Sequence, residues 1–251
     1  MKRIRTGIRG FDELIQGGIP ETFSLLVCGT PGTGKSIFGL EYIYHGAKDF
    51  GDNGLYVTIE ERPEKLRDQA IQFGMDIVSI EKMGKIYFLK IPIDVHGFDI
   101  IGNIMNVATK MKAKRIVIDS LSILDINAGM YQMPITMLPE GDRHYTNSRS
   151  DLRDMKGDLV KQFIYFFVSR LSSLGATTIF IADAIEGQGY LTRDTVSEFV
   201  CDGIVKLEVK EFGNTLQRTI EVKKLRNTAL SPGLYTLKVD NKGLSVEPFN
   251  Y

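Results

Sequence analysis

Eight consecutive residues near the start of the chain match the phosphate-binding pattern G-x-x-x-x-G-K-[ST] at every fixed position. They are Gly29, Thr30, Pro31, Gly32, Thr33, Gly34, Lys35 and Ser36. Glycines let backbone N–H groups close around phosphate oxygens, the lysine can reach the β- and γ-phosphates, and the serine hydroxyl can ligate Mg²⁺. Because a strand-like run precedes the motif and a helical run follows it, the pattern predicts a nucleoside triphosphate site rather than a chance glycine-rich turn.

A second candidate for the same site is an acid at the end of another apolar run. Residues 115–120 read Arg-Ile-Val-Ile-Asp-Ser, so that three β-branched residues lead into Asp119. An acid at the carboxyl end of such a strand can hold Mg²⁺ beside a phosphate loop, often through water. We therefore expect Asp119 and Ser36 to form the metal site, although the acid alone would equally suit a surface cap.

Two adjacent carboxylates, Glu60 and Glu61, end a third apolar run. A carboxylate at the carboxyl edge of a parallel sheet can orient and deprotonate an attacking water. Adjacent strand residues point to opposite faces, so only one of the two should address the water directly. The sequence favours Glu60 as the base, with Glu61 as its partner. The alternative is a pair that complements the dipole of the helix opened by Pro63.

The elements that must position these residues alternate between short β-branched runs and longer runs of helical period. Strands are expected at Ser24–Gly29, Gly54–Glu60, Ile86–Ile91, Arg115–Ser120 and Thr177–Asp183, and helices at Lys35–Asp49, Glu64–Phe73, Asp99–Met111 and Lys156–Leu174. This order predicts an α/β fold in which helices cover both faces of a mainly parallel sheet.

The C-terminal quarter has a different pattern. Short turns separate four strand-like runs, Gly203–Glu211, Leu216–Leu225, Leu234–Val239 and Leu244–Glu247. Connections this short predict an antiparallel meander, here one that extends an edge of the parallel sheet. Because no long linker separates the meander from the rest, we expect a single domain over residues 1–251.

Residues 127–154 fit no regular element and are rich in Met, Gly, Pro and polar side chains. A loop of this length in a compact domain is usually functional or disordered. Three methionines, Met130, Met133 and Met137, could dock a protein partner. The segment carries three arginines against four acids, which does not predict strong binding to a phosphate backbone.

Composition excludes several classes of protein. Lys and Arg total 31, as do Asp and Glu, and the net charge of zero argues against a generally basic nucleic-acid binder. Two cysteines, Cys28 and Cys201, are too few for a disulfide framework or a four-thiolate zinc site, which favours a reducing compartment. No apolar run approaches the ~20 residues of a membrane helix, and none follows the basic N-terminus. We expect a cytoplasmic protein without membrane spans.

Short motifs also follow one another in a fixed order along nearly the whole chain. They read RTGIRGFDEL at 5–14, GGIP at 17–20, TIEERPE at 58–64, VIDSL at 117–121, RLSSLGATT at 170–178, EFVCDG at 198–203 and KKLRNT at 223–228. Together with the phosphate loop, their order and spacing resemble the KaiC-like ATPases of the RecA superfamily. The resemblance implies a RecA-like P-loop fold, bound ATP or ADP with Mg²⁺, and a homo-oligomeric ring, as a hexamer, with nucleotide between the subunits.

In that family a K-x-R element reaches from one subunit to the phosphates of its neighbour. Carried over, the resemblance gives Lys224 and Arg226 roles in trans, with the logic of an arginine finger. The alternative is two solvated charges that protect an edge strand. Asn227 stands where the family usually has Gly, and Asn tolerates left-handed backbone better than most residues.

The function expected from the resemblance is a slow, Mg²⁺-dependent, ring-forming and regulatory ATPase. The chain carries one such domain and no phosphoacceptor pair near residues 187–190, so a clock role or autokinase activity is not implied. One alternative is a recombinase-like ATPase that binds DNA through loops 127–154 and 186–194, although nucleic acid is not favoured. Another is a nucleotide-gated interaction module with negligible turnover, which would use 127–154 for a protein partner.

Overall fold

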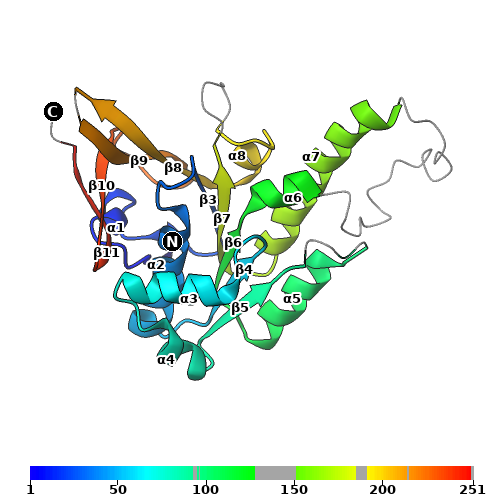
Figure 1. Cartoon of the computed structure of the whole chain (residues 1–251), viewed down its shortest axis with the longest axis horizontal. Helices are drawn as coiled ribbons and strands as arrows, with labels where there is room; N and C mark the ends of the chain where they lie inside the picture. Colours follow the sequence, from blue (N-terminus) through cyan, green and yellow to red (C-terminus); the bar gives the residue numbers. More distant parts are fainter. Residues whose placement is uncertain (93–94, 96, 128–150, 185–190, 214, 250–251) are drawn as a thin grey trace.

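The computed structural model describes residues 1–92, 95, 97–127, 151–184, 191–213 and 215–249 (Figure 1). One sheet contains nine strands in the order β11-β10-β9-β8-β3-β7-β6-β4-β5. Its strands are β3 Ser24–Gly29, β4 Gly54–Thr58, β5 Ile86–Lys90, β6 Arg115–Asp119, β7 Thr177–Asp183, β8 Gly203–Phe212, β9 Thr215–Leu225, β10 Tyr235–Asp240 and β11 Gly243–Pro248. A separate two-stranded sheet pairs β1 Arg3–Ile4 with β2 Ile19–Pro20.

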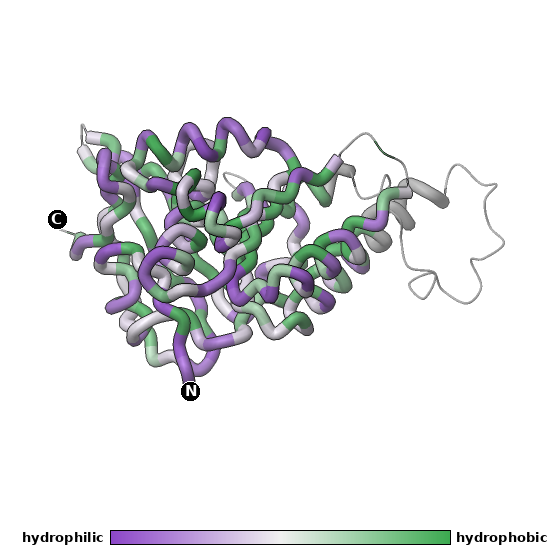
Figure 2. Tube along the Cα trace, turned by 90° about the horizontal axis from the view of Figure 1, so that it is seen from below, coloured by the Kyte–Doolittle hydropathy of each residue, from purple (hydrophilic) through white to green (hydrophobic). Residues whose placement is uncertain are grey.

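Helices cover both faces of the large sheet, as the alternating pattern predicted (Figure 1). They are α1 Phe11–Leu14, α2 Lys35–Phe50, α3 Pro63–Gln72, α4 Ile77–Lys82, α5 Ile100–Lys110, α6 Leu121–Asn127, α7 Asp151–Ser172 and α8 Ser197–Val200. Side chains alternate between the two faces along each strand. In β3, Leu25 and Val27 therefore join the core under α2, whereas Leu26 and Cys28 join the core that includes residues of α5 and α7. Figure 2 shows these apolar strands enclosed by the more polar outer elements.

Six strands, from β8 to β5 across the sheet, run parallel to one another. Parallel strands bring their carboxyl ends to one edge of a sheet. Gly29 of β3 consequently lies beside Asp183 of β7, and Asp119 of β6 lies beside Thr58 of β4. The phosphate loop and the acid of β6 are thus placed along one edge.

The C-terminal meander is confirmed and extends the sheet from β8 through β9 and β10 to β11. The position predicted for Lys224 was wrong in one respect, because β9 is not an edge strand but lies between β8 and β10. Pairing between β9 and β10 covers only Thr219 and Ile220. The end of β9 that carries Lys224 is therefore paired to β8 but not to β10.

The differences from the sequence-based expectation are mostly short elements. The helices α1, α4, α6 and α8 have between four and seven residues, too few to display a helical period. The segment expected to be irregular begins at the last residue of α6, and α7 begins at Asp151, five residues before the predicted start. Residues 128–150, with the three methionines, and 185–190 lie outside the described part of the chain.

Both cysteines are buried and free. Burial raises the pKa of the Cys28 thiol to about 12, which makes it a packed apolar group rather than a nucleophile. No helix in the described residues is long and apolar enough to cross a membrane.

Candidate nucleotide-binding site

The phosphate loop joins β3 to α2 in a conformation that depends on its glycines. Gly32 and Gly34 have φ angles of 80° and 105°, a left-handed region that side chains with a Cβ rarely adopt. Gly34 is the N-cap of the 16-residue helix α2. The first N–H groups of a helix lack partners within it, and its dipole favours negative charge there. The loop therefore presents backbone donors suited to phosphate oxygens.

Lys35 holds the loop together from inside. Its buried Nζ donates to the carbonyl oxygens of Gly29 at 2.7 Å and Thr30 at 2.9 Å. It also pairs with Oδ1 of Asp183 at 3.0 Å. Asp183 was missed in the sequence, although its place at the end of a strand neighbouring β3 was a usable signal. The ammonium group is thus poised beneath the loop, where phosphate oxygens would compete with Asp183.

The structure brings Ser36 and Asp119 together. The Ser36 hydroxyl donates to Oδ2 of Asp119 at 2.8 Å, and the Tyr56 hydroxyl donates to the same oxygen at 2.7 Å. Burial raises the pKa of the Asp119 carboxyl, while these two hydrogen bonds oppose the rise. Tyr56 was missed, because nothing in the sequence distinguishes it from a packed strand tyrosine.

A hydroxyl and a carboxylate are oxygen ligands of the kind that Mg²⁺ prefers. No group of three or more His, Cys, Asp or Glu side chains suited to a metal occurs in the described residues. A site that supplies only one or two protein oxygens fits Mg²⁺, which keeps several of its waters and binds substrate phosphates. Ser36 and Asp119 are therefore the residues that would hold it.

The two glutamates follow β4 at the same edge. Two hydrogen bonds hold the backbone that carries them. Lys90 Nζ donates to the Glu60 carbonyl at 2.9 Å, and Thr58 Oγ1 donates to the Glu61 carbonyl at 2.8 Å. Glu61 lines a cavity of about 270 Å³ together with Ser36, and its carboxylate lies 3.6 Å from Lys65 Nζ. The exposed Glu60 carboxylate has no hydrogen bond or ion pair within the described residues.

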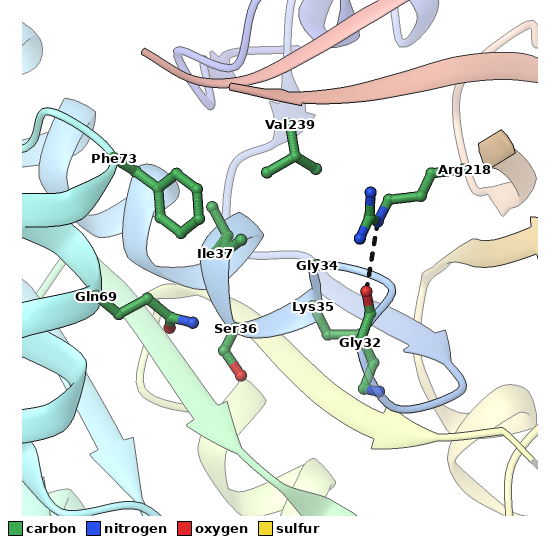
Figure 3. A pocket seen from close by; sticks show the side chains of 9 residues that line it. All are labelled: Gly32, Gly34, Lys35, Ser36, Ile37, Gln69, Phe73, Arg218 and Val239. Atoms are coloured by element: carbon green, nitrogen blue, oxygen red, sulfur yellow. Dashed lines mark hydrogen bonds between the residues drawn. The ribbon is translucent and has the colours of Figure 1, made fainter. Parts of the chain in front are cut away.

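A second cavity of about 290 Å³ opens beside the loop (Figure 3). Its apolar walls are Ile37 of α2, Phe73 after α3 and Val239 of β10, and its polar groups include Gln69 and Arg218. Arg218 of β9 also donates from Nε to the Gly32 carbonyl at 3.4 Å. The meander thus supplies one wall of a pocket that joins apolar surface to the phosphate loop. The sequence gave no sign of this cavity, because its residues come from four separate elements.

Lys224 and Arg226 lie at the opposite end of β3 from the phosphate loop. Arg226 pairs through NH1 with Oδ1 of Asp202 at 3.1 Å, and the other oxygen of Asp202 accepts from the backbone N–H and hydroxyl of Ser24. Ser24 begins β3 and Gly29 ends it, a separation of roughly 17 Å for an extended strand. Lys224 donates to the Cys201 carbonyl at 2.8 Å, and burial lowers its pKa. Both cations are therefore far from the phosphates of their own chain.

A KaiC ATPase family model matches residues 4–133 and 147–250. The chain belongs to the KaiC family of ATPases. Circadian clock oscillator proteins KaiC of Prochlorococcus marinus strain MED4 and of Synechococcus elongatus are each 31% identical to it over 255 residues. These alignments cover 98% of the chain but only 45% and 44% of the two relatives. The chain therefore spans less than half the length of these KaiC proteins.

A solved KaiC-like protein from the archaeon Pyrococcus horikoshii OT3 has the same fold, with a TM-score of 0.79 and 30% identity. The match covers 98% of this chain and 99% of the archaeal one. The predicted mainly parallel sheet with a C-terminal antiparallel extension is thus confirmed as a KaiC-like RecA fold.

One further residue ties the meander of this KaiC domain to the phosphate-loop helix. Glu41 of α2 is 3% exposed and accepts a hydrogen bond from the Leu244 N–H at the start of β11. Burial raises the pKa of its carboxyl to about 8, with Arg9 acting against the rise and Asp240 with it. This hydrogen bond holds the start of β11, where Leu244 pairs with Val239 of β10, against α2.

Glu41 predicts a specific pH dependence of stability. Because the folded state binds the Glu41 proton more tightly than the unfolded state, this contribution is complete below about pH 4.5 and is lost as the pH rises towards about 8. The slope is at most about 1.4 kcal/mol per pH unit. Glu41→Gln keeps the acceptor without the proton, so urea titrations should show the difference in free energy of unfolding between wild type and variant changing over this range. Parallel pH curves would contradict the raised pKa.

Proposed function

We propose that this KaiC-family chain is a single ATPase domain that hydrolyses ATP slowly with Mg²⁺, assembles into a hexameric ring and has a regulatory role. The observation that carries the proposal is the meeting of Lys35, Ser36 and Asp119 at one edge of the sheet. A phosphate loop, a buried ammonium and two oxygen ligands are the set that binds and polarises a nucleoside triphosphate.

Each group has a role in the proposed site. Lys35 would exchange its contact with Asp183 for the β- and γ-phosphates. Ser36 and Asp119 would hold Mg²⁺, which would neutralise phosphate charge. The cavity walled by Ile37 and Phe73 would receive the adenine ring of ATP, since apolar and aromatic surface next to a phosphate site suits a nucleobase.

We assign to Glu60 the role of the general base that activates water, and to Glu61 the role of its supporting partner. Glu61 lies in the cavity with Ser36 but is engaged by Lys65, whereas the Glu60 carboxylate is unpaired within the described residues. An unpaired carboxylate at a strand end can turn towards a water at the γ-phosphate, and catalytic contacts often form only in the substrate complex.

The position of Lys224 and Arg226 supports the proposed ring assembly. Arg226 and Lys224 lie at the amino end of β3, too far along that strand to contact the phosphates bound at its carboxyl end. If they contact ATP, the ATP belongs to a neighbouring copy of the chain. Nucleotide would then lie between subunits, and hydrolysis would depend on assembly.

The test measures ATP turnover and native mass with and without Mg²⁺. We expect turnover only with Mg²⁺, and a sixfold mass when Mg·ATP is present. Lys35→Ala should weaken ATP binding by about 100-fold or more, because it removes charged hydrogen bonds to two phosphates. Lys48→Ala, in the last turn of the same helix, is the matched control and should bind as wild type.

Two results would contradict the proposal. Wild-type ATP affinity in a folded Lys35→Ala protein would show that the loop does not hold the phosphates. Full turnover in a protein whose mass stays that of one chain would remove the ring and the trans residues together.

A further inference from the structure

The N-terminal strand β1 contacts the turn that follows β9 through the side chain of Arg3, next to a longer contact from Asn227 Nδ2 to Met1 Sδ at 3.8 Å. Its NH2 donates to the Asn227 carbonyl and to the Thr228 hydroxyl, both at 3.1 Å. Its NH1 donates to the carbonyls of Ile15 and Gly18, both at 2.9 Å. One guanidinium therefore joins the N-terminal hairpin to the residues directly after Arg226, more than 220 positions later in the chain.

The turn that carries Arg226 has one hydrogen bond of its own, from the Thr228 hydroxyl to the Arg226 carbonyl at 3.3 Å, and little strand pairing around it. Pairing of β9 with β8 ends at Leu225, and β10 pairs with β9 only near Ile220. Beyond that point the backbone N–H of Arg226 donates to the Asp202 carbonyl at 3.0 Å, and Asn227 adopts a left-handed φ of 56°. The direction in which Arg226 leaves the sheet is thus set by Asp202 on one side and by Arg3 on the other.

Arg3 is itself held in place before it meets the turn. Its strand β1 pairs with β2 at Arg3 and Ile4. The next residue, Arg5, is anchored by its carbonyl, which accepts from NH1 of the fully buried Arg115 at 2.7 Å. A planar guanidinium presents its donors in a fixed fork. Arg3 is therefore a preorganised support rather than a surface charge that found a nearby acceptor.

We propose that Arg3 is a positioning residue for Arg226: by fixing the carbonyl of Asn227 and the hydroxyl of Thr228, it aims the finger at the neighbouring subunit's phosphates. The inference rests on the proposed trans role of Arg226. It adds that the N-terminal strand, distant from Arg226 in sequence, determines how well that finger works. Arg3 touches no phosphate and acts only through the turn.

The test combines Arg3→Ala with Arg226→Ala in the full chain. Arg3→Ala should lower kcat by roughly 10- to 100-fold, the effect of displacing a catalytic group by about an ångström, and leave the KM for ATP unchanged. In the Arg226→Ala background it should have no further effect, because a positioning residue has nothing left to position. Lys2→Ala is the matched control, since within the described residues the side chain of this neighbour forms its ion pair with Glu21, and it should turn over as wild type.

Further readouts separate positioning from a loss of fold. Hydrogen exchange of residues 224–230 should be faster in Arg3→Ala than in Lys2→Ala under conditions where both are unassembled. Arg3→Lys should recover only part of the lost kcat, because one ammonium cannot replace a fork that bonds five acceptors. If Arg3→Ala does not fold, Arg3→Lys and the exchange of this segment carry the same test.

The outcomes distinguish this inference from the function on which it rests. If Arg226→Ala turns over slowly and Arg3→Ala turns over as wild type, the positioning role of Arg3 is overturned and the finger role of Arg226 stands. Losses that multiply in the double variant would show that Arg3 acts elsewhere, which also overturns the inference. Wild-type turnover in Arg226→Ala would overturn the finger itself and the positioning role with it.

Discussion

Glu60→Gln should bind Mg·ATP as wild type and hydrolyse it about 10²–10⁴ times more slowly. This is the usual contribution of a positioned general base, and glutamine keeps the size of the side chain while removing its capacity to accept a proton. The measurement is single-turnover hydrolysis at saturating ATP, together with nucleotide affinity measured separately. A loss of affinity equal to the loss of rate would show a binding role instead.

Glu61→Gln is the matched comparison, since it makes the same chemical change one residue later. We expect a smaller loss, about tenfold, because Glu61 already pairs with Lys65 and would act by orienting its neighbour and the adjoining cavity. If Glu61→Gln is inactive and Glu60→Gln turns over normally, the two roles are reversed. The cavity that Glu61 shares with Ser36 would then be the place of the attacking water.

Arg226→Ala should lower turnover at full ATP occupancy by about 10³, the lower end of what an arginine finger contributes. Affinity for ATP should change little, because the side chain acts on charge that develops as the γ-phosphoryl group departs. Asp202, the present partner of Arg226, stays satisfied by Ser24 in this variant. The fold should therefore tolerate the change, which circular dichroism and thermal unfolding can check.

Mixing two inactive proteins provides the decisive form of this experiment. A Glu60→Gln subunit keeps Arg226, and an Arg226→Ala subunit keeps Glu60. When the two co-assemble, one orientation of the mixed interface places an intact Glu60 opposite an intact Arg226. Activity should return in such mixtures, because some interfaces unite an intact base with an intact finger. Absence of recovery in mixtures proven to co-assemble would leave Arg226 as a surface charge in its own chain.

Residues that act through local pattern could be found from the sequence. The phosphate loop and Asp119 were located because a strand, a glycine-rich turn and a strand-end acid are continuous in the chain. The same reasoning applied to Thr177–Asp183 would have found Asp183, since it ends a strand that adjoins β3.

What escaped prediction is assembled from distant segments. Phe73, Val239 and Arg218 meet only because the meander folds back over α2, and nothing in the neighbours of each residue in the chain indicates this. Placing Lys224 on an edge strand was wrong because β9 is the second strand of the meander and lies between β8 and β10. The sequence did not show that pairing of β9 with β10 covers only Thr219 and Ile220. Arg3 reads as one of several basic residues at the N-terminus until its partner at Asn227 is known.

The carboxylate of Asp202 accepts hydrogen bonds from two groups at once. One is the hydroxyl of Ser24, the first residue of β3, and the other is the guanidinium of Arg226. Because a strand is stiff along its length, a displacement of β3 on phosphate binding at its carboxyl end would reach Ser24 at its amino end. It would then be passed to Asp202 through the hydrogen bonds from Ser24. In a closed ring, nucleotide binding in one subunit would then affect its Arg226 and so the site of one neighbouring subunit, in the same direction around the ring.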